Sequence, residues 1–143
     1  MPDERYTTPF GKARVHREGG DLTVVTWGAM VYTADEAAQQ LDGDGVSVEI
    51  LDLRTLAPWD KQAVLESVRK TSKVLVLHED THTGGFGGEI AATIAEEAFE
   101  DLDAPIKRIT APDSPVPFSP PLEKAFIPQV EDVAAGLREL AEY

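Results

Sequence analysis

Apolar positions follow two spacings along this chain, and the two spacings alternate from segment to segment. Runs rich in Val, Ile and Leu predict strands at residues 22–27, 46–53, 73–78 and 106–110, and a weaker alternation predicts an edge strand at 13–18. Between these runs, apolar residues recur every three or four positions, which is typical of amphipathic helices. The helices are expected to follow Gly28, to follow Asp60 as N-cap, and to span 88–102 and 130–142.

Strands that alternate with helices indicate parallel crossover connections and helices on both faces of one sheet. We therefore predict an α/β fold, a three-layer α/β/α domain over residues 13–143 with a mostly parallel five-stranded sheet and one antiparallel edge strand at 13–18. Residues 1–12 are polar, contain Pro2 and Pro9, and are predicted to be a linker or the edge of the chain. Residues 112–121 form a proline-rich connection that is too apolar and too short for a disordered tail.

The composition narrows the classes of partner. The chain has 143 residues, a formal net charge of −13 and no cysteine. A charge of this sign repels nucleic acid and anionic membranes, so neither is an expected partner. Two explanations of the acidity stay open, a basic protein partner or an adaptation to a high-salt interior. The absence of cysteine, and of any apolar run of about 18 residues, is compatible with a cytoplasmic protein, which is the expected location.

The string from His78 to His82, His-Glu-Asp-Thr-His, has the H-E-x-x-H form of zinc peptidases. In those enzymes both histidines lie on one face of a helix, and the glutamate (here Glu79) acts as general base. This string instead follows an apolar run typical of a buried strand and precedes a glycine-rich segment at 84–88, which disfavours a helix. We therefore expect His78 to end a strand and His82 to lie in a loop without zinc. The carboxylates that could supply a third zinc ligand lie on the helix expected over 88–102 and are Glu96, Glu97 and Glu100.

Polar groups follow three of the predicted strands, at Trp27-Gly28, at residues 52–55 and at residues 78–80. Ligand sites in such folds lie beyond the carboxyl ends of the strands, so these groups mark the expected working edge. Arg54 and Glu79 are expected to form a charge pair there, with a structural rather than a catalytic role. The glycines of 84–88 open a helix N-terminus able to bind an anion, but they match no nucleotide motif, and close helix–strand packing is the simpler explanation.

Several runs along the chain, taken together, resemble one family. They include Gly11-Lys12-Ala13, Arg17-Glu18-Gly19, residues 49–56, residues 67–71, His78-Glu79, Thr83-Gly84-Gly85-Phe86, Ala104-Pro105-Ile106 and Asp113-Ser114-Pro115. From about residue 9 onward the chain resembles the carboxy-terminal, transketolase-type domain of the beta subunit of 2-oxoacid dehydrogenases. Pro58-Trp59-Asp60, together with His78-Glu79 followed by Thr83 to Phe86, is most similar to the branched-chain, 2-oxoisovalerate members.

The resemblance implies a reaction for the parent enzyme, but it does not imply that this chain catalyses that reaction. Family members decarboxylate a 2-oxoacid on thiamine diphosphate and magnesium, and then acylate a lipoyl group. The cofactor lies between a pyrophosphate-binding and a pyrimidine-binding domain, whose G-D-G…N loop and catalytic histidine are not found in this sequence. We therefore assign no catalytic, cofactor-binding or metal residue, and expect this chain alone to be inactive.

The resemblance also implies partners and interface residues. The expected partners are a second beta subunit, an alpha subunit or alpha-like region, and the basic subunit-binding domain of the dihydrolipoyl acyltransferase. Structural or interface candidates are Arg54, His78, Glu79 and Glu89, and docking candidates on the terminal helix are Glu131, Asp132, Glu139 and Glu142. The alternatives are a free-standing anion- or partner-binding module of the same fold, and a zinc hydrolase. The residues leave the 2-oxoacid open among branched-chain, pyruvate and related acids.

Overall fold

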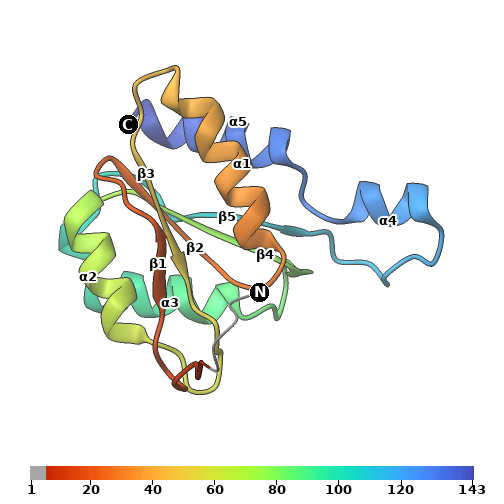
Figure 1. Ribbon diagram of the computed structural model, residues 1–143, viewed down its shortest axis with the longest axis horizontal. Helices are drawn as coiled ribbons and strands as arrows, with labels where there is room; N and C mark the ends of the chain where they lie inside the picture. Colours follow the sequence, from red (N-terminus) through yellow and green to blue (C-terminus); the bar gives the residue numbers. More distant parts are fainter. Residues whose placement is uncertain (1–5) are drawn as a thin grey trace.

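One mixed sheet of five strands lies between two layers of helices in the computed structural model, which describes residues 6–143 (Figure 1). The strands are β1 (Arg14–Arg17), β2 (Leu22–Thr26), β3 (Val48–Asp52), β4 (Val74–Thr81) and β5 (Lys107–Ala111). The helices are α1 (Met30–Asp42), α2 (Lys61–Thr71), α3 (Gly87–Glu97), the short 3₁₀ helix η1 (Phe99–Asp101), α4 (Pro120–Phe126) and α5 (Val130–Ala141). The strand order is β1-β3-β2-β4-β5, with β1 antiparallel to β3 and all other pairs parallel. The expected three-layer fold with one antiparallel edge strand is confirmed.

The sheet is buried on both faces, which explains the unbroken apolar runs of its central strands. On one face Leu75 and Leu77 of β4 pack with residues of α1 and α5, among them Leu41 and Leu137. On the other face Val76 packs with residues of α2 and α3. Successive side chains of β4 therefore point to opposite helical layers, as the pleat of a strand requires. Figure 1 shows the same division, with α1 and α5 on one side of the sheet and α2 and α3 on the other.

β4 extends further than its apolar run. The sequence predicts a strand over 73–78, whereas β4 spans Val74–Thr81, so His78 lies inside the strand and not at its end. The pairing with β5 becomes irregular after Leu77 and resumes at Thr81, opposite Ala111. The hydrophobic pattern alone predicted too early an end for the strand, because pairing with β5 continues beyond the apolar residues.

The start of α2 agrees with the sequence prediction, whereas the end of α3 does not. The expected N-cap of α2 is confirmed, since the Asp60 carboxylate accepts a hydrogen bond from the Ala63 N–H at 3.3 Å. The single helix expected over 88–102 is divided, because Ala98 leaves the helical region at φ −140° and only a 3₁₀ turn follows α3. No helix within residues 6–143 is long and apolar enough to cross a bilayer.

A segment that the sequence pattern left without a helix forms an arm. Residues 112–129 leave the end of β5, turn through α4 and return to α5, and Figure 1 shows α4 well away from the sheet. Two prolines occupy the first positions of α4, where a missing N–H costs no helical hydrogen bond. The prolines that indicated a connection therefore also start a helix of seven residues.

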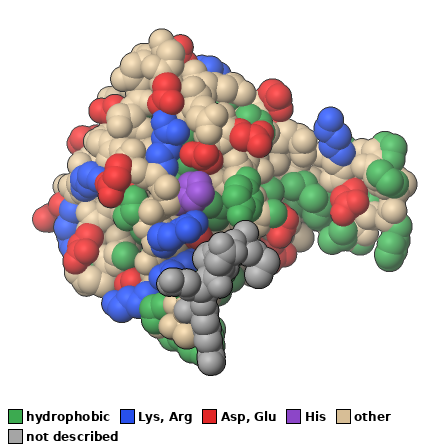
Figure 2. All heavy atoms as spheres, in the orientation of Figure 1, with side chains coloured by type: hydrophobic (Ala, Val, Ile, Leu, Met, Phe, Trp, Pro, Cys, Tyr) green, Lys and Arg blue, Asp and Glu red, His purple; other side chains and the backbone are tan. Residues whose placement is uncertain are grey.

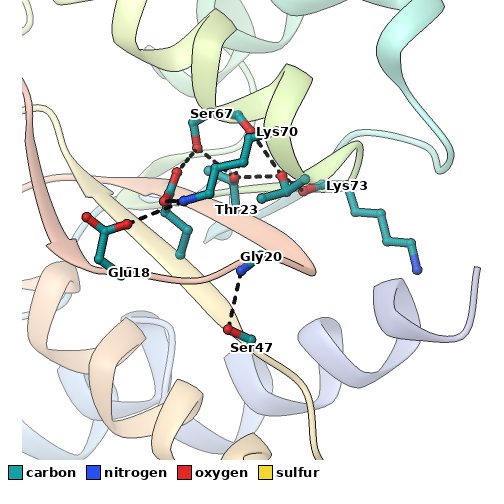
Figure 3. A network of polar contacts seen from close by, with 9 residues as sticks. Glu18, Gly20, Thr23, Ser47, Ser67, Lys70 and Lys73 are labelled. Atoms are coloured by element: carbon teal, nitrogen blue, oxygen red, sulfur yellow. Dashed lines mark hydrogen bonds and ion pairs between the residues drawn. The ribbon is translucent and has the colours of Figure 1, made fainter.

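A buried polar network fixes the amino-terminal ends of β2 and β3 against α2 (Figure 3). The Glu49 carboxylate, 3% exposed, accepts hydrogen bonds from the Ser67 hydroxyl at 2.6 Å and from the Lys70 ammonium. The Thr23 hydroxyl bonds those of Ser67 and Thr71 at 2.7 and 2.8 Å. These contacts lie at the end of the sheet opposite the predicted working edge, and we assign them to stability.

Candidate site at the carboxyl edge of the sheet

An aromatic cluster occupies the carboxyl ends of β2 and β4. β2 and β4 are adjacent and parallel, so Trp27 and His78, which follow or end their apolar runs, come together. The two rings are stacked, with centroids 5.2 Å apart and planes 12° from parallel. Phe86 meets Trp27 edge-on at 6.2 Å, and Trp59 meets Phe86 edge-on at 6.1 Å. Four separate segments of the chain thereby contribute one ring each to a single cluster, in which Trp27 is stacked directly on the imidazole.

His78 is a buried, neutral histidine in this cluster. Its side chain is 1% exposed, and its Nδ1 accepts the backbone N–H of Asp80 at 3.2 Å. With Nδ1 as acceptor, Nε2 is the protonated nitrogen of this tautomer, and it has no hydrogen-bond partner among the described residues. Burial lowers the pKa of His78 below its ordinary value of 6.5. The ring can therefore stabilise the packing of its neighbours, but it is not accessible to a substrate in solution.

The glycines of 84–88 make room for that ring. A Cβ on Gly87 would lie 2.4 Å from His78 Nε2, and one on Gly85 would lie 2.7 Å from His78 Cε1. The first turn of α3 thus packs directly on the imidazole, which supports the interpretation of these glycines as close helix–strand packing. Glu89 lies in this first turn and is exposed, where a carboxylate stabilises the positive end of the helix.

The geometry separates the two histidines of the H-E-x-x-H string. His78 lies in a strand, not on a helix, and points into the core. His82 is exposed beyond the strand, where its Nε2 meets the Arg108 guanidinium at 2.8 Å. Glu97 of the neighbouring helix pairs with Lys61. Within residues 6–143 no three His, Asp or Glu side chains converge on a point that a metal ion could occupy.

The charge pair expected between Arg54 and Glu79 is wrong. Arg54 follows β3 and Glu79 lies within β4, and β2 lies between these two strands. The Arg54 guanidinium instead donates to the carbonyl of Lys12 at 2.7 and 3.0 Å and to that of Ala13 at 3.3 Å. Glu79 is exposed to solvent. Arg54 therefore holds the segment before β1 against the carboxyl edge, a role that the strand order decides and the sequence pattern did not indicate.

A clamp between two loops was missed by sequence reasoning. The backbone N–H and the hydroxyl of Thr83 donate to the Asp113 carboxylate at 2.8 and 2.7 Å. The hydroxyl bond is the larger cause that lowers the pKa of Asp113 below its ordinary value of 3.8. Thirty residues separate the partners, and the only signal for their association was that both lie in runs that resemble the same family.

Two of the four docking candidates on α5 already have local partners. Asp132 accepts the Gln129 N–H at 3.0 Å in a capping box at the start of the helix. Glu139 pairs with Lys107 of β5. Glu131 and Glu142 are exposed. The acidic surface offered to a partner by these four residues is therefore concentrated in two of them.

The chain matches the family described as the transketolase C-terminal domain over residues 11–133. It belongs to this family. Among relatives of this transketolase C-terminal domain, 2-oxoisovalerate dehydrogenase subunit beta of Bacillus subtilis is 48% identical over 144 residues, covering 100% of the chain and 44% of that protein. Two other beta subunits of Bacillus subtilis follow: that of acetoin:2,6-dichlorophenolindophenol oxidoreductase is 44% identical (98% and 41% covered), and that of the pyruvate dehydrogenase E1 component is 40% identical (100% and 44%).

A solved structure described as a split gene transketolase, inactive beta4 tetramer, has the same fold. Its TM-score is 0.82 at 29% identity, with 99% of the chain and 44% of that chain covered. The chain thus spans less than half the length of the relatives it matches. The resemblance stated from the motifs is confirmed at the level of the domain family and of similarity to beta subunits.

Proposed function

We propose that this transketolase C-terminal domain is the assembly and docking domain of the beta subunit of a thiamine-diphosphate-dependent 2-oxoacid dehydrogenase, and that the parent enzyme acts on branched-chain 2-oxoacids such as 2-oxoisovalerate. The supporting observation is 48% identity, over the whole chain, to a 2-oxoisovalerate dehydrogenase beta subunit. Acetoin and pyruvate relatives lie only a few points lower, at 44% and 40%, so the choice of substrate depends on a small margin.

The carboxyl edge of the sheet does not suit thiamine diphosphate and magnesium. Aromatic rings fill it, His78 is closed off from solvent, and the residues described between 6 and 143 contain no convergent His, Asp and Glu set for a metal. We therefore place the cofactor on other parts of the parent enzyme and give this domain no reacting group. Calorimetric titration of the chain with thiamine diphosphate and Mg²⁺ should give no saturable heat, and stoichiometric micromolar binding would contradict this assignment.

The arm supports a role in assembly. Val116, Phe118 and Leu122 are 63%, 104% and 60% exposed, and Figure 2 shows apolar side chains gathered at this end of the molecule. No charged residue occurs between Ser114 and Leu122 in a chain of net charge −13. Exposed apolar patches of this kind mark protein interfaces. We propose that the arm packs against a second beta subunit or an alpha subunit, within a cytoplasmic complex.

The docking partner tests the proposal most directly. Surface plasmon resonance would compare binding of the chain to the basic subunit-binding domains of branched-chain and pyruvate dihydrolipoyl acyltransferases. We expect saturable binding, with the branched-chain domain bound more tightly. Equal affinity would contradict the substrate assignment, and binding of neither would favour the alternative, a free-standing anion- or partner-binding module.

A further inference from the structure

A groove of about 560 Å³ lies beside the edge strand β5. One wall comes from β5 and the loop before α3, with Arg108, Thr110 and His82. The other wall is the returning part of the arm, where Phe126 and Ile127 supply apolar surface. The groove therefore offers a cationic wall opposite an apolar wall, in a volume within the ordinary range for small-molecule sites.

Arg108 differs electrostatically from most cations of this chain. Most of the described lysines and arginines pair with a carboxylate, as Arg69 does with Asp101 at 3.3 Å and Arg138 with Asp44 at 3.0 Å. No carboxylate among residues 6–143 forms such a pair with Arg108, although the sequence has 26 acidic residues against 13 basic ones. A guanidinium without a carboxylate, in so acidic a chain, favours an external anion.

A chain of hydrogen bonds fixes the orientation of that guanidinium. Arg108 donates to the His82 carbonyl at 3.2 Å and to His82 Nε2 at 2.8 Å. Because Nε2 accepts, the imidazole proton lies on Nδ1, which donates to the Thr110 hydroxyl at 3.3 Å. The Thr110 hydroxyl in turn donates to the Ala111 carbonyl at 2.9 Å. These bonds use part of the planar fork of Arg108, and its remaining N–H donors are available to a ligand.

We propose that this groove binds a small monocarboxylate with a short apolar body, with the carboxylate on Arg108 and the apolar body against Phe126 and Ile127. A guanidinium pairs with a carboxylate in two parallel hydrogen bonds, which a single arginine can supply. A phosphate dianion fits less well, because Arg108 is the only lysine or arginine of the described residues that lines the groove, and the net charge is −13. Asp132 also lines the groove, and the Gln129 N–H offsets part of its charge.

This site goes beyond the assembly function and does not depend on it. No residue of the groove belongs to the aromatic cluster, and the groove uses the returning residues 125–128 of the arm and not the exposed Val116, Phe118 and Leu122 that we propose to pack against a partner subunit. The sequence placed a possible anion site at the glycines of 84–88. The groove instead uses cationic and hydroxyl side chains of β5 and of the loop before α3, which the register between β4 and β5 brings together.

The experiment is an NMR titration of the chain with three matched probes. 4-Methylpentanoate has both the carboxylate and the apolar body, acetate has the head alone, and 4-methylpentanamide has the body without the charge. We expect 4-methylpentanoate to shift the amides of residues 108–111 and 125–127 saturably, with a dissociation constant of about 1 mM or tighter. Acetate and the amide should each bind at least tenfold more weakly.

Variants of Arg108 test whether 4-methylpentanoate binds in the groove or elsewhere on the chain. Arg108→Met should weaken 4-methylpentanoate binding at least tenfold, and Arg108→Lys should give an intermediate constant because it keeps the charge and loses the fork. Arg69→Met, which removes an exposed arginine on α2, is the matched control and should bind as the unmodified chain does. Unchanged binding in a folded Arg108→Met variant, or saturable shifts confined to other residues, would overturn the proposal. Tighter binding of a leucine-ended tetrapeptide would identify a protein tail and overturn the assignment to a small acid.

Discussion

At the scale of single residues, His78 shows how much burial changes the meaning of a motif. Its string suggests a metal ligand, whereas its ring is stacked on Trp27 and enclosed by Gly85 and Gly87. The string could not reveal this, because Trp27 and His78 meet only through the order of β2 and β4 in the sheet. What the sequence could predict was the apolar run before His78, and that run was enough to disfavour the helix that zinc binding needs.

We predict that His78 makes the domain less stable in mild acid. Its pKa is lowered in the folded state, so below pH of about 6.5 the unfolded chain takes up a proton that the folded chain does not. The free energy of unfolding should then decrease as the pH falls, by at most about 1.4 kcal/mol per pH unit from this residue. Urea melts between pH 7.5 and 5.5 should show a smaller decrease for His78→Leu. Val76→Ala, a destabilising change on the same strand, should keep the original pH dependence, and an unchanged slope in His78→Leu would refute the prediction.

The Thr83 clamp leads to a prediction about Asp113. Thr83→Val removes the hydroxyl donor and keeps the backbone N–H, so the pKa of Asp113 should rise toward 3.8 without fully reaching it. Because the folded-state pKa is lowered, the clamp stabilises the fold above the unfolded value and loses this effect as the pH falls through the folded one. Carboxyl ¹³C NMR titration measures the shift directly. Ser114→Ala, beside the clamp, is the control, and an unaltered Asp113 titration in Thr83→Val would show that the hydroxyl is not the cause.

At the scale of elements, the pattern of apolar residues predicted which segments are helices and strands better than it predicted where they end. β4 gains residues through its pairing with β5, and α3 ends early at Ala98. α4 was missed because its two leading prolines are common both in connections and at helix starts. In each case the deciding contact comes from another element or from backbone geometry, which periodicity does not report.

The network of Figure 3 gives a prediction at this scale. Lys70→Met leaves the buried Glu49 carboxylate with the Ser67 hydroxyl as its remaining side-chain donor, and should lower the free energy of unfolding by about 1–3 kcal/mol. The cost is below that of a fully buried pair because Lys70 is half exposed. The double variant Glu49→Gln/Lys70→Met should recover part of this loss in denaturant melts.

Glu18 provides the control for that cycle. It is the second carboxylate partner of Lys70, at 3.3 Å, but its side chain is 81% exposed. Glu18→Gln should therefore change the free energy of unfolding by less than about 1 kcal/mol. Strictly additive losses in the Glu49 and Lys70 variants would mean that these two residues do not stabilise the sheet as a pair.

At the scale of the whole molecule, the fold followed from the alternation of strands and helices, and the family followed from runs spread over most of the chain. The arrangement of the molecular surfaces could not be predicted from the sequence. The arm and the groove beside it depend on where residues 112–129 return to the sheet, and no local pattern specifies that path. The acidic excess was evident from composition, but the structure decides which carboxylates are already engaged.

The dependence of the association rate on salt concentration and on charge-removing substitutions tests whether the exposed carboxylates of α5 attract a basic partner. Glu131 and Glu142 are exposed, whereas Asp132 caps the helix and Glu139 pairs with Lys107, so Glu131→Gln/Glu142→Gln removes charge without breaking a local contact. The association rate with a basic subunit-binding domain should decrease severalfold at low salt and converge with that of the unmodified chain at high salt, while the dissociation rate changes less. Glu66→Gln/Glu96→Gln, on the opposite helical layer, removes the same charge and should change the association rate less. If both double variants slow association equally, net charge rather than this helix attracts the partner, and salt-independent binding would leave these acids as solvated surface.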